Sequence, residues 1–225
     1  MVVAEVARRE RERTPLSRAR VLTAAVALAD DAGFGSVTMR SLATHLGVKP
    51  MALYHHVASK DEIVDGMVDA VFAQIELPEP DVSWRPAMRA RAVSTRAVLT
   101  AHPWATPLMS SRSHPGPATL GHLDWVIGTL RRGGFTAAQI AHAYALLDSY
   151  IYGFALEEAG LPLDAASDVA QQVEAMVQQF TPAEYPHLHE FTVEHVLQPE
   201  YNFALEFEYG LDLILDGIER SLVIV

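Results

Sequence analysis

The side chains best suited to recognising another molecule are concentrated in one short stretch, GVKPMALYHHVASK at residues 47 to 60. Lysine ammonium groups pair with anions, tyrosine and histidine rings offer hydrogen bonds, and methionine offers a soft apolar contact. The candidates are Lys49, Met51, Tyr54, His55, His56 and Lys60. Because the two histidines are adjacent, they cannot share one helix face, and at least one must point outward. A stretch this short needs neighbouring elements to hold it in place.

Catalytic chemistry has much weaker support in the sequence. Cysteine is absent, which removes disulfides, thiolate zinc sites and cysteine nucleophiles. There is no phosphate-binding P-loop and no G-x-S-x-G elbow, and GFGSVT at residues 33 to 38 lacks the third glycine of a dinucleotide-binding turn. We therefore expect no catalytic residue and no cofactor, with an enzyme in the acidic remainder of the chain as an alternative.

The ten histidines raise the question of a metal site. The segment HLHEFTVEH at residues 187 to 195 invites comparison with the zinc-protease pattern H-E-x-x-H. Its candidate ligands His189 and His195 are six residues apart and fall on different helix faces, whereas the pattern requires i and i+4. We expect no metal ligand, and a structural or adventitious site at His187 and His189 is the alternative.

Three predicted helices position the polar stretch. The first, capped by Ser17, covers about residues 18 to 32; the second covers about 38 to 46 and the third about 50 to 57. Gly47 breaks the chain between the second helix and the third, whose proline suits a first helical turn. Such a glycine turn between short helices predicts a helix-turn-helix, whose last helix lies in the DNA major groove.

The third helix must have an inward and an outward side. Leu53 and Val57 are four residues apart and are predicted to face the core. The other residues of this stretch remain for DNA bases and phosphates, which explains why so many hydrogen-bonding groups stand together: Lys49, Met51, Ala52, Tyr54, His55 and His56.

The rest of the chain is predicted to be helical, because apolar residues recur every three or four positions without β-branched alternation. Capping boxes at Ser59 with Glu62, at Thr136 with Gln139 and at Thr181 with Glu184 begin three of the helices. We expect an all-α fold. Beyond a proline-rich joint, the predicted helices cover about residues 85 to 101, 104 to 110, 117 to 132, 137 to 159, 165 to 180, 183 to 196 and 202 to 222.

Charge is distributed unevenly along the chain. The net charge is -11, but residues 1 to 60 hold nine Lys/Arg and five Asp/Glu, giving +4, while residues 61 to 225 hold eight and twenty-three, giving -15. Screening limits each exposed charge to about 10 Å in ordinary salt, so a basic head on an acidic body can approach nucleic acid locally.

No membrane segment or signal peptide is expected. The N-terminal residues become densely charged after a short apolar stretch, and the longest uncharged runs fall short of the roughly 20 apolar residues that cross a bilayer. Together with the missing cysteines, these features predict a cytoplasmic protein.

Residues 17 to 67 resemble the DNA-binding domain of the TetR family of bacterial one-component repressors. The motif LYHHV-x-x-K followed by an acidic, apolar helix carries the resemblance. The acidic remainder, with an LEE segment ending a long helix and an aromatic terminal helix, resembles the tetracycline-repressor type of C-terminal domain. The resemblance implies a homodimer that binds double-stranded DNA at a palindromic operator and releases it when a small molecule binds.

The expected domains follow from this resemblance. Residues 1 to 14 are expected to form a flexible charged arm, 15 to 60 the helix-turn-helix domain, 61 to 84 a connecting helix and linker, and 85 to 225 a larger helical ligand-binding and dimerisation domain.

The resemblance also assigns the DNA-binding residues. Arg40 is the candidate for a bidentate contact to guanine, the first residues of the third helix face bases, and Tyr54, His56 and Lys60 contact phosphates. The alternatives are a solvated Arg40 and a Tyr54 packed inward. The predicted DNA contacts are Thr38, Arg40, Lys49, Pro50, Met51, Ala52, Tyr54, His55, His56 and Lys60.

A ligand pocket is expected among the large side chains of the C-terminal region. Polar residues that interrupt apolar helix faces are the most suggestive, because a ligand can satisfy them. Thr95, His122, His142 and Asp148 are of this kind, whereas an ordinary core is the alternative for most of the aromatic residues. The predicted pocket residues are Met88, Thr95, Trp104, Met109, Trp125, Tyr144, Asp148 and Met176.

Tetracycline-binding relatives chelate a drug-bound magnesium ion through a histidine and a glutamate. The resemblance places the histidine position on Met109, although Glu157 could match the glutamate. The chelating pair is incomplete, so a more apolar or aromatic effector is expected.

The last helix carries a broad apolar stripe. In the family, this helix and the long helix at residues 137 to 159 pair with their copies in a four-helix bundle; an intramolecular core helix is the alternative. The predicted interface residues are Ile151, Phe203, Phe207, Leu211, Ile214 and Ile218.

The leading functional hypothesis is a ligand-responsive DNA-binding transcriptional regulator, a repressor that a small molecule releases. A regulator controlled by a protein partner instead of a ligand is the second hypothesis.

Overall fold

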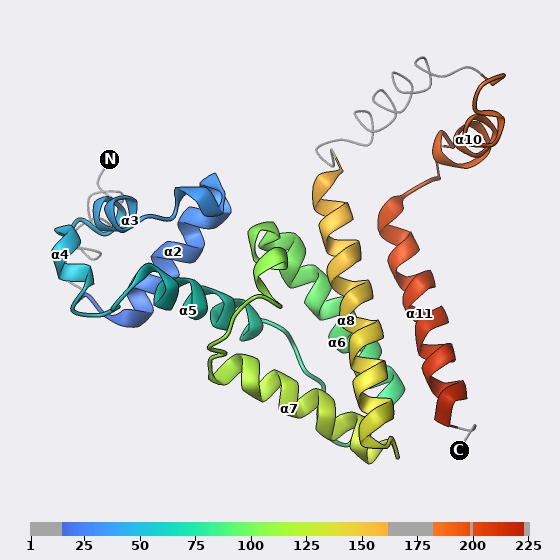
Figure 1. The fold of residues 1–225 in the computed structure, drawn as a ribbon, viewed down its shortest axis with the longest axis horizontal. Helices are drawn as coiled ribbons and strands as arrows, with labels where there is room; N and C mark the ends of the chain where they lie inside the picture. Colours follow the sequence, from blue (N-terminus) through green and yellow to red (C-terminus); the bar gives the residue numbers. More distant parts are fainter. Residues whose placement is uncertain (1–14, 162–181, 199, 223–225) are drawn as a thin grey trace, which may run out of the picture. The chain divides into compact units, whose positions relative to one another are not determined.

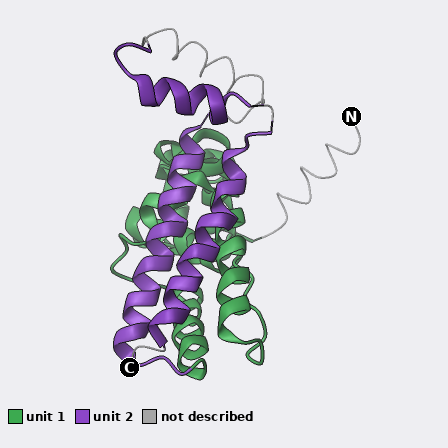
Figure 2. Ribbon diagram, turned by 90° about the vertical axis from the view of Figure 1, so that its right-hand side faces the viewer, with its two compact units in different colours: residues 1–133 green, residues 134–225 purple. Residues whose placement is uncertain are grey.

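The computed structural model describes residues 15–161, 182–198 and 200–222. All regular structure in these ranges is helical and no strand occurs among them, which confirms the all-α fold. The chain divides into two compact units, residues 1–133 and 134–225, shown in green and purple in Figure 2.

The first unit begins with a small helical head (Figure 1). Its elements are α2 (Arg18–Ala32), η1 (Phe34–Ser36), α3 (Met39–Leu46), α4 (Pro50–Leu53) and α5 (Lys60–Phe72). Ser17 caps α2 by accepting a hydrogen bond from the Arg20 N–H, and Ser59 caps α5 by accepting from the Glu62 N–H. The Glu62 carboxylate reaches back to the Ala58 N–H at 2.7 Å, so the predicted Ser59–Glu62 pairing is present with a one-residue shift.

The core of the head forms where α2, α3, α4 and α5 meet. Leu42, Leu53 and Ile63 are each 0 % exposed, and burial of such side chains contributes roughly 1.5 to 3 kcal/mol each. Helices α2 and α5 pack closely at Gly66, because a Cβ added there would lie 2.6 Å from the Leu22 side chain. The head therefore braces a four-residue α4 that could not fold alone.

The remainder of the first unit comprises α6 (Trp84–Ala101), η2 (Pro103–Leu108) and α7 (Pro117–Arg132). The indole N–H of Trp125 on α7 donates to the Pro78 carbonyl at 3.0 Å, which ties the loop before α6 to α7. The long helix α5 packs on α7 as well as on α2, so α5 is shared by the head and the body of this unit.

The second unit contains α8 (Ala137–Gly160), α10 (Pro186–Phe191), η3 (Thr192–Val196) and α11 (Phe203–Leu222). Thr136 and Gln139 form the predicted capping box at the start of α8. Helices α8 and α11 lie side by side (Figures 1 and 2). Gly210 permits the contact: a Cβ there would meet the Tyr150 hydroxyl, which donates to the Phe207 carbonyl at 2.9 Å.

Three predicted helices differ from the structure in their type or extent. Helix α4 ends at Leu53, and the chain continues to Val57 as a turn, with the Val57 N–H donating to the Leu53 carbonyl at 3.0 Å. Residues 103–108 are a 3₁₀ helix containing Pro107, and residues 186–196 divide into a short α-helix and a π-helical turn. The helix predicted at residues 165 to 180 and the Thr181 capping box lie outside the described residues.

Candidate DNA-reading head and effector region

The turn between α3 and α4 depends on glycine. Gly47 has φ 70° and ψ 28°, the left-handed conformation that costs other L-residues about 1–2 kcal/mol. The Val48 N–H then donates to the Ala43 carbonyl at 2.9 Å, which closes the end of α3. Lys49 is extended and Pro50 opens α4, so the turn sets the direction of the short helix.

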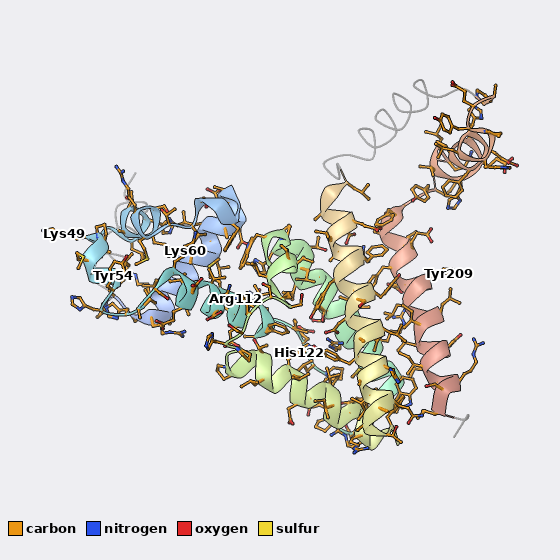
Figure 3. All side chains as sticks on the ribbon, viewed as in Figure 1. Lys49, Tyr54, Lys60, Arg112, His122 and Tyr209 are labelled. Atoms are coloured by element: carbon orange, nitrogen blue, oxygen red, sulfur yellow. The ribbon has the colours of Figure 1, made fainter. Side chains whose placement is uncertain are left out.

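Helix α4 presents a clear outward face. Met51 is 71 % exposed and Tyr54 is 48 % exposed, while Leu53 and Val57 are buried as predicted. Figure 3 labels Lys49 and Tyr54, which project from the α4 end of the head. The inward alternative for Tyr54 is therefore not what the structure has. Of the remaining predicted DNA contacts, Ala52 and His56 are half-buried, and the exposed ones are Thr38, Arg40, Lys49, Pro50, His55 and Lys60.

Thr38 already has a structural task at the start of α3. Its hydroxyl accepts a hydrogen bond from the Ser41 N–H at 3.1 Å, and its own N–H donates to the Ser41 hydroxyl at 2.9 Å. This reciprocal cap fixes the first turn of α3, and Arg40, two residues after Thr38, is exposed and lines an open groove together with Thr38.

Lys60 lies at the start of α5, close to an aromatic pair. Its Nζ is 5.6 Å from the centre of the Phe34 ring, within the range of a cation–π contact. Phe34 in turn stacks on Trp104 with ring centres 6.4 Å apart. The contact restrains the Lys60 ammonium without burying it, so its charge stays available to an anion.

A polar joint connects the head to η2. The Asp30 Oδ1 on α2 accepts hydrogen bonds from the Trp104 indole N–H and from the His102 Nδ1, both at 2.7 Å. The other ring nitrogen of His102 is 3.1 Å from the Gln74 side-chain oxygen, just past the end of α5. His102 is 8 % exposed, so this network fixes η2 against two helices of the head from a largely buried position.

A second joint connects α5 to α7. The Asp69 carboxylate accepts from the Thr119 N–H at 2.8 Å and from its hydroxyl at 3.0 Å, so α5 supplies the cap for the first turn of α7. A Cβ at Gly116 would lie 2.3 Å from this carboxyl group, which accounts for glycine there. Arg112 adds a 2.6 Å bond from Nε to Asp65. These hydrogen bonds connect α5 directly to the start of α7 and to the loop before it.

A buried polar pair lies between α6 and α7. Arg91 is 0 % exposed and its Nε–H donates to His122 Nε2 at 2.9 Å. Burial, followed by the Arg91 charge, lowers the pKa of His122 from 6.5 to about 3. His122 is therefore neutral, and because Nε2 accepts, the ring proton must sit on Nδ1.

The proton on His122 Nδ1 has no acceptor among the described residues, and Thr106 Oγ1 in η2 is likewise unsatisfied there. A buried donor left unsatisfied costs about 1–3 kcal/mol. The prediction of pocket residues left out Arg91. The available signal was its position on the apolar face of α6, between Met88 and Thr95, where a charged residue is out of place.

The predicted pocket residues fall in both units. In the first unit Met88, Thr95, Trp104 and Met109 are buried, and Trp125 is half-buried. Trp104 is engaged by Asp30 at the joint. In the second unit Asp148 is buried and Tyr144 half-buried, while Met176 lies outside the described residues. Their common role in one pocket stays a prediction.

The position that the resemblance assigns to a magnesium ligand is apolar. Met109 is 7 % exposed, and a thioether is a poor ligand for magnesium, which prefers oxygen. Glu157 is exposed. Across residues 15–161, 182–198 and 200–222, no three His, Asp or Glu side chains gather as a metal site would require.

The predicted interface residues are largely internal to one chain. Ile151, Phe207 and Leu211 are 0 % exposed and Ile218 is 4 % exposed, whereas Phe203 and Ile214 are half-buried. Phe203 stacks on Phe154 of α8 with ring centres 4.6 Å apart, so this stripe serves the α8–α11 contact within the chain. The exposed apolar residues of the same two helices are Leu146, Leu156, Leu205, Tyr209 and Leu213.

A reading helix exposed after a left-handed glycine turn, on a small head joined to a larger helical region, defines a helix-turn-helix DNA-binding protein. Comparison with known proteins agrees. Residues 21–67 match the family described as bacterial regulatory proteins, tetR family, and residues 77–222 match the tetracyclin repressor-like C-terminal domain. The chain belongs to the TetR family of transcriptional regulators, and the enzyme alternative is set aside.

Two relatives illustrate the match. The HTH-type transcriptional repressor DrrR1 of Streptomyces coeruleorubidus is 32 % identical over 209 residues, covering 89 % of this chain and 76 % of that protein. An HTH-type transcriptional regulator of Saccharopolyspora erythraea is 36 % identical over 147 residues, 65 % of this chain and 62 % of the relative, so this alignment spans less than two thirds of that protein's length.

Among solved structures, the Streptomyces coelicolor TetR family protein ActR in complex with actinorhodin superposes with a TM-score of 0.77 at 25 % identity, covering 93 % of this chain and 99 % of that one. No helix in the described part of the chain has the length and apolar character needed to cross a membrane.

Proposed function

We propose that this chain is a homodimeric repressor that binds a palindromic operator through α3 and α4 and is released by an aromatic small molecule. The observation that carries the proposal is the split of α4 into a buried side, Leu53 with Val57, and an exposed side, Met51 with Tyr54. Such a repressor would act in the cytoplasm, where the chromosome lies. The division at residues 15–60, 61–84 and 85–225 is retained as part of the proposal.

The exposed residues of the head have distinct proposed roles. Arg40 would contact guanine O6 and N7, and Met51 with Ala52 would meet a thymine methyl group. Tyr54, His56 and Lys60 would contact phosphates, which position the protein without reading sequence. His55, exposed beside them, would reinforce the phosphate contacts. Thr38 would act indirectly, since its hydroxyl orients α3 through Ser41.

A dimer would use the outer faces of α8 and α11. Leu146, Leu205, Tyr209 and Leu213 are each more than half exposed, an unusual number of large apolar side chains for a surface that stays in water. Pairing two copies there would present two α4 helices to successive major grooves, about 34–36 Å apart.

The effector is proposed to be aromatic and to bind in the C-terminal domain. ActR, which has the same fold, has been crystallised with actinorhodin, and in this chain Met88 of α6, Trp104 of η2 and Met109 directly after η2 are buried. An effector that favours the released form by ~3 kcal/mol would weaken operator binding roughly a hundredfold. The two joints on α5 and η2 are the proposed route from α7 to the head.

The proposal is tested in two stages with the purified full-length protein. Genomic footprinting first identifies a bound fragment, which should contain an inverted repeat. Aromatic compounds are then added to the complex, and one that lowers operator affinity should be recovered chemically unchanged. If the protein converted the compound into a product, this result would support an enzyme instead of a repressor. A footprint without symmetry would contradict the dimer, and release only by a cellular protein would favour control by a protein partner.

A further inference from the structure

We infer that His122 forms an acceptor-recognising subsite for the effector, in which its Nδ1–H donates a hydrogen bond to a carbonyl, carboxylate or phenolate oxygen on an aromatic compound. The inference rests on the proposed effector-released function and specifies the chemistry of one end of the ligand.

The hydrogen-bond pattern fixes what His122 can offer. The Arg91 guanidinium is always a donor, so its 2.9 Å contact requires the lone pair of His122 Nε2. A neutral imidazole then carries its only proton on Nδ1. That nitrogen is buried and has no partner in the described part of the chain. Buried donors are almost always satisfied, so an unmatched one indicates a group that binds there.

The surroundings of the ring argue for an aromatic body behind the acceptor oxygen. Phe72 on α5 contacts His122 edge to face, with ring centres 5.2 Å apart. His122 itself is 3 % exposed, so a ligand oxygen that reaches it must leave water and enter an apolar site. An aromatic carbonyl or acid tolerates that transfer better than a sugar or a polyol.

Arg91 is proposed to position His122. Its bond to Nε2 holds the imidazole in the Nδ1–H tautomer. Burial, followed by the Arg91 charge, lowers the pKa of His122 to about 3, so the ring does not accept a second proton. The ring therefore keeps its Nδ1–H donor throughout the physiological pH range.

Two substitutions separate the functions of the two ring nitrogens. In His122→Gln, the side-chain oxygen can replace Nε2 as acceptor for Arg91, but the Nδ1–H donor is lost. In His122→Asn, the side-chain amide nitrogen can replace Nδ1 as donor, whereas the acceptor for Arg91 is lost. Circular dichroism and thermal melting verify that each full-length variant is folded.

Calorimetric titration without DNA uses three probes on one bicyclic ring: 1-acetonaphthone, 1-naphthoate and 1-methylnaphthalene. Wild type and His122→Asn should bind an oxygen-bearing probe about tenfold more tightly than 1-methylnaphthalene, and His122→Gln should lose this preference. Tighter binding of 1-naphthoate would assign a carboxylate, and tighter binding of 1-acetonaphthone a carbonyl.

Nitrogen-15 NMR of histidine-labelled wild type gives a second readout. The His122 Nδ1 resonance should shift with an oxygen-bearing probe and stay in place with 1-methylnaphthalene. Equal affinity for all three probes, no binding at millimolar concentration, or a resonance indifferent to every probe, as a resident water would give, overturns the inference. Binding through His122 with unchanged operator affinity would instead leave the subsite standing and contradict effector release.

Discussion

At the scale of single residues, His122 is predicted to make stability depend on pH. Its pKa is 6.5 when unfolded and about 3 when folded, so below pH 6.5 the unfolded chain binds the extra proton. Stability is therefore fully present above pH 6.5 and falls as pH drops toward 3, by at most about 1.4 kcal/mol per pH unit.

Urea unfolding at pH 7, 6 and 5 measures this dependence. His122→Gln should remove part of the decline, while the matched change at the exposed His114 should leave it intact. A difference between wild type and His122→Gln that is constant over the three pH values would show that His122 is not held neutral.

Lys60 is predicted to contribute one phosphate contact. Its ammonium is exposed and restrained above Phe34, so little side-chain freedom should be lost when DNA binds. Lys60→Ala should weaken binding to all sequences alike and reduce the slope of log affinity against log salt by about one. Arg131→Ala, on α7 outside the proposed DNA face, serves as control, and an unchanged slope for Lys60→Ala would remove it from the phosphate contacts.

At the scale of elements, the α3–α4 turn should be sensitive to one methyl group. Gly47→Ala forces alanine into a left-handed conformation at φ 70° and should destabilise the protein by about 1–2 kcal/mol. Gly35→Ala is the control, because Gly35 has no positive φ and a Cβ added there would meet nothing within 4 Å. Operator affinity should fall only in Gly47→Ala, and equal melting temperatures for the two variants would contradict the role of the turn.

Local sequence patterns predicted the start of a helix correctly where an N-cap residue fixes it. Ser17, Ser59 and Thr136 each accept the hydrogen bond that the sequence indicated, because an N-cap acts within three residues. The length of α4 was overestimated, since periodicity placed Val57 on the core face without showing that residues 54–56 form a turn.

The contacts that form the two joints and the Arg91–His122 pair could not be predicted from the sequence. Asp30 and His102 are 72 residues apart and Arg91 and His122 are 31 apart, so only the packed fold brings them together. The predicted interface residues of α11 also show what a sequence pattern cannot decide. A helical period marks an apolar face, but α11 has apolar residues on two faces, and packing against α8 decides which one is covered.

At the scale of the whole molecule, the outer faces of α8 and α11 are predicted to hold two chains together. Tyr209→Glu and Leu213→Glu place charge on side chains that are 68 % and 53 % exposed, so the single chain should fold while the dimer dissociates. Light scattering after size exclusion should report half the wild-type mass. Leu123→Glu on α7 should stay dimeric, and a dimer that survives both α11 changes would exclude this surface.

Residues 1 to 60 carry a net charge of +4 and residues 61 to 225 a net charge of -15, and specific DNA binding by a chain with this charge distribution is the central claim to test. The direct measurement compares the affinity of the purified protein for its footprinted genomic fragment and for a shuffled fragment of equal length, over a series of salt concentrations. The account predicts a preference of about a thousandfold or more and a steep loss of affinity with salt. Equal affinity for both fragments, even at low ionic strength, would contradict it.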